Sequence, residues 1–133
     1  MAKSNIRAGA TMRDALLQNA VLAGIIDQRV FPLRAPKNTK GSYILYGRDG
    51  YEPSRTLMGN VENVAEVMVN AYSTDYDETL DMAEAIEDTV RVMRNAGTEI
   101  FVADAIEDVS GYTDTGETIF VQSFTIKFGT LKK

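Results

Sequence analysis

The alternation of apolar and polar residues over positions 64–78 predicts a strand that runs almost directly into a helix. Between positions 64 and 72 apolar side chains occupy both parities, which is typical of a strand covered on both faces. Thr74 is the expected N-cap of the helix, and Asp77, three residues later, completes a variant of the capping box. Acidic residues at positions 75, 77 and 78 suit a helix N-terminus. A central strand should therefore be followed at once by a helix that covers it.

This helix is expected over residues 75–95, and a shorter helix over residues 11–22. The long helix has apolar residues on one face, namely Tyr76, Leu80, Ala83, Ile86, Val90 and Met93. Its opposite face is charged, with Asp77, Asp81, Glu84, Asp88 and Arg91. Arg94 lies in its last turn and Gly97 is the expected C-terminal break. The short helix has an apolar stripe of Leu16, Leu17, Ala20 and Val21, with Gly24 as its stop.

Three further segments have the patterns of strands, at residues 43–47, 99–107 and 118–128. The last one alternates Phe120, Phe124, Ile126 and Phe128 against Val121, Ser123, Thr125 and Lys127, with Ile119 and Gln122 breaking the pattern. Residues 31–40 are expected to be extended and residues 110–116 to form a turn. These elements predict an α+β fold with a mostly antiparallel sheet of about four or five strands packed with two helices.

Length and composition point to one domain over residues 1–133. A chain of 133 residues that is 44% hydrophobic can bury one core without a disulfide or a metal staple. It contains no cysteine, and it has neither a signal-peptide pattern nor an apolar run of membrane-spanning length. We expect a soluble intracellular protein.

The net charge of -5 is unevenly distributed. Residues 29–55 contain six basic and two acidic residues, whereas residues 56–117 contain two basic and fifteen acidic ones. Opposite charges on one chain favour head-to-tail contacts between copies, and a closed ring is one product of such contacts. The alternative is that these charges only keep the surface solvated. An acidic chain with a pI of about 4.7 is not expected to bind DNA tightly.

The inventory of catalytic groups is small, because the chain has no histidine and no cysteine. Asp114-Thr115-Gly116 matches the D-T-G of aspartic proteases, but the polar residues before it favour an ordinary hairpin loop. A calcium loop starting at Asp75 would need glycine where Leu80 stands, so helix capping explains those acids better. A cation site remains an alternative at the acidic hairpin, with Asp104, Glu107, Asp108, Asp114 and Glu117. No catalytic, cofactor-binding or metal-binding residue is assigned.

The order of motifs over residues 13–95 resembles the phage tail-completion family. After a helix, it comprises R-V-F-P-x-x-A-P at 29–36, Y-I-L-Y at 43–46, V-x-V-x-A-Y-S-x-D-Y-D-E at 67–78 and a helix rich in Ala and Glu. The resemblance implies a structural protein of the virion tail, present in the host cytoplasm during assembly, that forms a hexameric ring and joins the tail tube to the head. Its implied partners are tail-tube and head-connector proteins, with DNA only as transiting cargo and no membrane or cofactor.

Two other functions remain open from the sequence. One is a head-tail connector or minor tail protein of the same particle, and the other is a small enzyme or ligand-binding domain that uses carboxylates or a divalent cation.

The segment at residues 48–60 is the expected contact between subunits. It is too long for a tight hairpin turn, and loops of this length are usually functional or mobile. Its candidate interface residues are Tyr51, Arg55, Leu57 and Met58. Alternatively, Leu57 and Met58 simply begin the following strand.

Overall fold

The structure, a computed structural model, describes residues 7–131 apart from residues 38, 53–60, 99 and 114. The described helices are α1 (Ala8–Leu17), α2 (Ala20–Ile26) and α3 (Tyr76–Asn95). The described strands are β1 (Val30–Pro32), β2 (Tyr43–Glu52), β3 (Val61–Ser73), β4 (Ile100–Tyr112) and β5 (Thr118–Leu131). The α+β class is confirmed, with three helices in place of two. No helix in the described part of the chain combines the length and apolar character that crossing a membrane requires.

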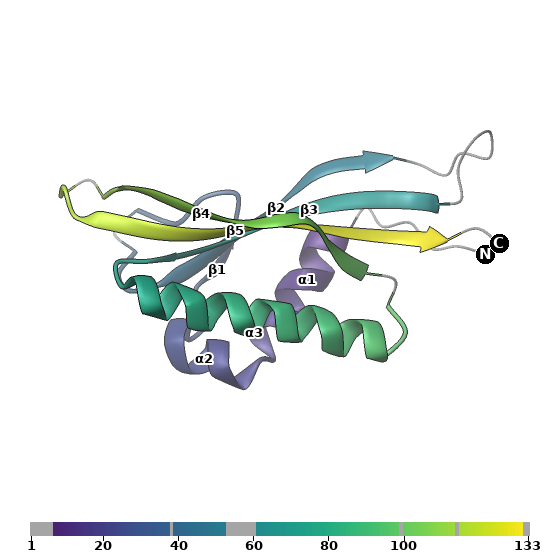
Figure 1. Cartoon of the computed structure of the whole chain (residues 1–133), viewed down its shortest axis with the longest axis horizontal. Helices are drawn as coiled ribbons and strands as arrows, with labels where there is room; N and C mark the ends of the chain where they lie inside the picture. The colour runs from purple at the N-terminus through teal and green to yellow at the C-terminus, as the bar shows by residue number, and fades with distance from the viewer. Residues whose placement is uncertain (1–6, 38, 53–60, 99, 114, 132–133) are drawn as a thin grey trace.

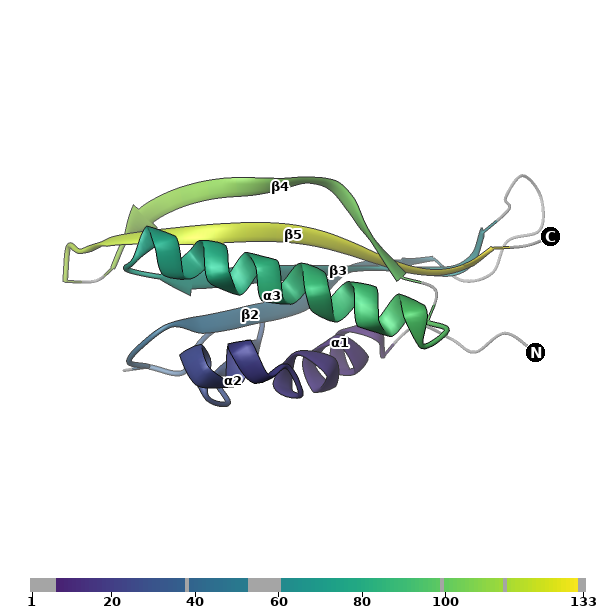
Figure 2. The same cartoon turned by 60° about the horizontal axis from the view of Figure 1, so that its bottom comes forward.

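The fold has two layers, a twisted sheet and a layer of helices on one of its faces (Figure 1). The strands lie in the order β1-β2-β3-β5-β4, and only β1 and β2 are parallel. The core lies between the layers, where Met12, Leu16, Leu22, Ile44, Val67, Val69, Met82, Ile86, Phe124 and Ile126 are among the fully buried side chains. Helix α3 lies along the sheet beside α1 and α2 (Figure 2).

Strand β3 is central, as expected, but it is covered on only one face. Ala65, Val67, Val69 and Ala71 are fully buried under the helices, whereas residues 66, 68, 70 and 72 between them are half-buried. The prediction of two covered faces was wrong because all three helices pack on the same side of the sheet. Apolar residues of the other parity are shielded by neighbouring strands instead: the ring of Tyr72 stacks on that of Tyr43 at 4.8 Å.

The predicted boundaries of helix α3 are correct to within one residue, but its N-cap and its buried face differ from the predicted ones. Asp75, not Thr74, caps the helix, because its carboxylate accepts hydrogen bonds from the backbone N–H groups of Asp77 and Glu78. Gly97 ends it at φ +101°, with the paired backbone bonds of a Schellman motif. The buried face includes residues outside the predicted apolar face, namely Thr79, Met82, Ala85 and Thr89, and Tyr76 is exposed.

The predicted first helix is in fact two helices, separated at Asn19. The Oδ1 of Asn19 accepts hydrogen bonds from the backbone N–H groups of Val21 and Leu22 and so begins α2. Gly24 lies inside α2, and the predicted stop there was wrong. Leu17 and Val21 are exposed, because the buried stripe runs through Met12, Leu16, Leu22 and Ile26.

The strands are longer than their apolar patterns predicted. Strand β2 continues to Glu52, so residues 48–52 are paired with β3 through a bulge and do not belong to a loop. Strand β4 likewise includes residues 110–112, which the sequence assigned to a turn. The turn itself is short: the Thr113 N–H donates to the Glu117 carbonyl, and Gly116 has φ +87°. Thr115 and Gly116 of the D-T-G motif therefore lie in a hairpin loop, as the polar surroundings of the motif indicated, whereas Asp114 lies outside the described residues.

Candidate functional site and interaction surfaces

The predicted subunit contact lies largely outside the described residues. Arg55, Leu57 and Met58 belong to the segment at 53–60, and of Tyr51 only the backbone is described, where it pairs with Ala65 in β3. The prediction for these four residues therefore stays a prediction. Other surfaces of the described chain have the composition of contacts between proteins.

The first such surface is formed by residues 33–37 and 39–42, the described part of the connection between β1 and β2, here called the basic loop. Its Arg34, Lys37 and Lys40 are exposed, and none of these side chains forms a hydrogen bond or ion pair with another described residue. Arg29 instead turns inward, where its Nε donates to the carbonyl of Ser42 at 2.8 Å. Gly41, at φ +84°, leaves room for that guanidinium, because a Cβ there would lie 2.8 Å from it. The arginine thus supports the loop from beneath.

Leu33 begins the basic loop in an unusual conformation. It has φ +68°, a region that costs a residue with a Cβ about 1–2 kcal/mol. Its N–H donates to the Tyr46 carbonyl at 2.8 Å, and its side chain rests over Gly47, where a Cβ would lie 2.7 Å from Leu33 Cδ2. The side chain is nevertheless 70% exposed. The loop therefore presents a large apolar residue to solvent beside three cationic ones.

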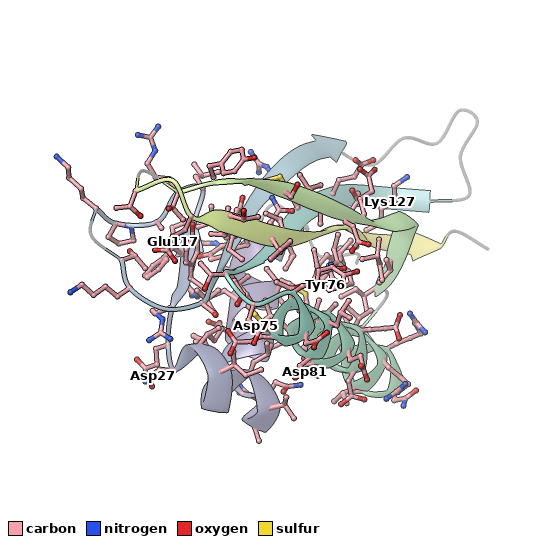
Figure 3. The ribbon with its side chains drawn as sticks, turned by 60° about the vertical axis from the view of Figure 1, so that its left-hand side comes forward. Asp27, Asp75, Tyr76, Asp81, Glu117 and Lys127 are labelled. Atoms are coloured by element: carbon pink, nitrogen blue, oxygen red, sulfur yellow. The ribbon has the colours of Figure 1, made fainter. Side chains whose placement is uncertain are left out.

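The second surface is a groove of about 750 Å³ between α2 and α3, here called the acidic groove. Its apolar part comprises Val21, Ile25 and Ala85, and Val21 is 58% exposed. Its acidic lining comes from α3, with Asp81, Glu84, Glu87 and Asp88. Figure 3 shows Asp81 on the side of α3 where α2 lies. Arg91 pairs with Asp88 at one end, so the groove keeps a net negative charge.

Asn19 holds the two walls of the acidic groove together. While its Oδ1 caps α2, its Nδ2 donates to the Ala85 carbonyl at 3.2 Å and to Thr89 Oγ1 at 3.0 Å, both on α3. Both ends of its side-chain amide are therefore bonded, the oxygen to α2 and the nitrogen to α3.

The sheet face opposite the helices is the third surface. Phe31, Tyr43 and Tyr72 form a row of aromatic rings on it, and burial raises the pKa of Tyr43. Beside them lies a shallow hollow of about 290 Å³, lined by Tyr72, Val109, Tyr112, Ile119, Val121 and others. Asn70 also lines it, and its buried Oδ1 has no hydrogen-bond partner among the described residues.

Of the acidic residues considered as a cation site, only Asp108 has a described side-chain partner; Glu107 and Glu117 are exposed, and the Asp104 side chain and Asp114 lie outside the described part of the chain. Asp108 accepts hydrogen bonds from Tyr76 Oη and Gln122 Nε2, and the Tyr76 bond raises the pKa of that phenol. At the start of α3, Glu78 Oε1 accepts from the hydroxyls of Ser42 and Ser73. Within the described ranges no three acidic residues converge as metal ligands would. Capping and side-chain bonding account for the acids at the start of α3, as the capping interpretation indicated.

The acidic groove and the exposed Leu33 were not predicted from the sequence. The charged face of α3 was predicted. Val21, however, was assigned to the buried stripe of a single helix, so a groove beside it could not be inferred. The one signal available was Asn19, a strong N-cap residue in the middle of the predicted helix.

The fold has a counterpart in a virus-like particle. A chain of the structure described as "Virion of native gene transfer agent (GTA) particle" superposes with a TM-score of 0.62, covering 93% of this chain and 93% of that chain at 12% sequence identity. At this identity the likeness establishes a shared fold. No protein-family model and no curated protein matches the sequence.

Proposed function

We propose that this chain is a structural protein of a phage-like particle, and that it closes the end of the tail tube as a ring and joins the tube to the head. The observation that carries the proposal is the fold shared with a chain of a gene transfer agent virion along 93% of both chains. The order of motifs over residues 13–95, which resembles the tail-completion family, supports it independently of the structure.

The work of such a protein is binding, and no residue is given a catalytic role. A hexameric ring contacts the tail tube on one side and head-connector proteins on the other, with DNA as transiting cargo. The many acidic residues suit this role, because a negatively charged passage repels DNA and lets it pass without sticking. The protein would be located in the virion tail, after assembly in the host cytoplasm.

The mass of the purified protein tests the ring. Light scattering coupled to size-exclusion chromatography should give a single species at a whole multiple of 14.6 kDa, with a sixfold mass for the hexamer. A protein that remains at 14.6 kDa when concentrated to about 100 µM, a hundredfold above a Kd of about 1 µM, does not form a ring by itself.

The predicted contact through residues 48–60 has its own test. Replacing Tyr51 and Arg55 together with Ala should lower the mass of the assembly while thermal unfolding of the subunit stays nearly unchanged. If the double variant retains the full mass at low micromolar concentration, these residues do not form the contact.

A further inference from the structure

We propose that the basic loop of one copy docks into the acidic groove of the next copy, and that this contact sets the head-to-tail order of subunits. The inference rests on the proposed ring and identifies the two surfaces that meet in it. Three features of the described chain support it: complementary charge, complementary apolar groups and the separation of the two surfaces on the subunit.

The charges of the two surfaces are opposite and largely unused within the subunit. Arg34, Lys37 and Lys40 form no side-chain bond with any described residue, and the same holds for Asp81, Glu84 and Glu87 in the groove. Each surface alone repels a second copy of itself, whereas the loop of one copy attracts the groove of another. The charge pattern therefore favours a heterologous contact over a symmetric pairing of two identical surfaces.

The apolar groups match in the same way. Leu33 is 70% exposed in the same loop as the cationic side chains, and Val21 is 58% exposed in the groove that the anionic ones line. Apolar anchors surrounded by charged residues are typical of contacts whose centre excludes water while the rim stays polar. Leu33 also keeps a left-handed backbone that a glycine would adopt without cost, so the chain retains a leucine there against a conformational penalty. Burial of that leucine by a neighbouring copy accounts for both features.

The surfaces lie on different parts of the subunit. The basic loop continues from the short strand at the edge of the sheet, whereas the groove lies in the helix layer between α2 and α3 (Figures 1 and 2). When two copies join through such a contact, the pair keeps one free loop and one free groove. Further copies can therefore add in the same way until a ring closes.

Two charge-reversal variants test the contact. The loop variant is Arg34→Glu with Lys37→Glu, and the groove variant is Glu84→Lys with Glu87→Lys. Each should be monomeric where the wild type is assembled, because its loop and groove now carry the same sign of charge. A mixture of the two should assemble again, because the intact loop of the groove variant meets the intact groove of the loop variant, and the reversed loop and reversed groove also carry opposite charges. Sedimentation velocity measures all three samples.

Matched substitutions control for nonspecific effects. Glu107→Lys with Glu117→Lys makes the same charge change on exposed residues outside the groove and should leave the assembly intact. Val21→Ser should weaken assembly about tenfold, whereas Val92→Ser on α3, where Val92 is 59% exposed but does not line the groove, should not weaken it. Circular dichroism and thermal unfolding verify that every variant folds.

The outcomes separate this contact from the ring itself. Loop and groove variants that are each monomeric but assemble when mixed support the contact. If both variants keep the mass of the wild-type assembly, or if each is monomeric and their mixture stays monomeric, the ring stands and this contact is overturned. A wild type that is itself monomeric at about 100 µM overturns the ring and the contact together.

Discussion

Asn19 should contribute more to stability than an ordinary polar residue, because it both begins α2 and attaches that helix to α3. In Asn19→Ala, the lost N-cap costs about 1 kcal/mol. The two lost hydrogen bonds to α3 each cost about 0.5–1.5 kcal/mol. The carbonyl of Ala85 is not left without a partner, because it still accepts a hydrogen bond from Thr89 Oγ1. We expect the free energy of unfolding to fall by about 2–4 kcal/mol, which lowers Tm by roughly 8–16 °C in a domain of this size.

Urea unfolding followed by circular dichroism measures this loss. Asn19→Ser provides the control, because serine retains an N-cap oxygen but has no amide to reach Ala85 and Thr89. It should lose about 1–3 kcal/mol, which is about 1 kcal/mol less than Asn19→Ala loses. If Asn19→Ala lowers the free energy of unfolding by less than about 0.5 kcal/mol, the structure assigns too much to this residue and the groove walls are held by packing alone.

Three further predictions concern backbone, ionisation and salt. Gly24→Ala should stabilise the protein by about 0.5–1 kcal/mol, because the added Cβ meets open space inside a helix. In the same unfolding assay Gly97→Ala should destabilise the protein by about 1 kcal/mol, because Gly97 has φ +101°. Equal effects of the two substitutions would contradict the assigned conformations. The hydrogen bond to Asp108 raises the pKa of Tyr76, so the stabilisation that this bond gives is present below about pH 10 and is lost as the pH rises through the folded-state pKa. Asp108→Ala should therefore make one tyrosine ionise at lower pH in an alkaline absorbance titration. An unchanged titration curve would exclude the bond. Raising the salt concentration from about 0.1 M to about 1 M shortens the Debye length from ~10 Å to ~3 Å, so the sedimenting species should shift toward smaller mass. Unchanged or larger species at high salt would mean that apolar burial dominates the contact.

The elements with strong periodic signals could be predicted from the sequence, and the way they pack could not. Helix α3 has a charged face, acidic residues at its start and a glycine after its end, and its boundaries were predicted to within one residue. The Thr74 cap was wrong because Thr74 and Asp75 are both good N-cap residues, and only the backbone geometry decides between them.

The prediction that β3 has two covered faces failed for a physical reason. Apolar side chains on both parities indicate burial, but a strand in the middle of a sheet is also shielded by its neighbours. Tyr72 is half-buried by stacking on Tyr43 without any helix above it. Burial by helices and burial by adjacent strands give the same sequence pattern.

The candidate surfaces could be predicted only in part. The opposite net charges of residues 29–55 and 56–117 indicated a head-to-tail contact, because charge can be counted along a sequence. The groove depends on the break at Asn19, which turns Val21 outward, and the exposure of Leu33 depends on a left-handed backbone. Neither is visible in periodicity, since both arise from single backbone positions.

Electron microscopy of the purified wild-type protein distinguishes a closed ring from every other assembly. We predict uniform closed rings with one rotational symmetry and a central opening, since a heterologous contact with the right rotation closes on itself. Open filaments, rings of mixed size or single subunits of 14.6 kDa under the same conditions would contradict it.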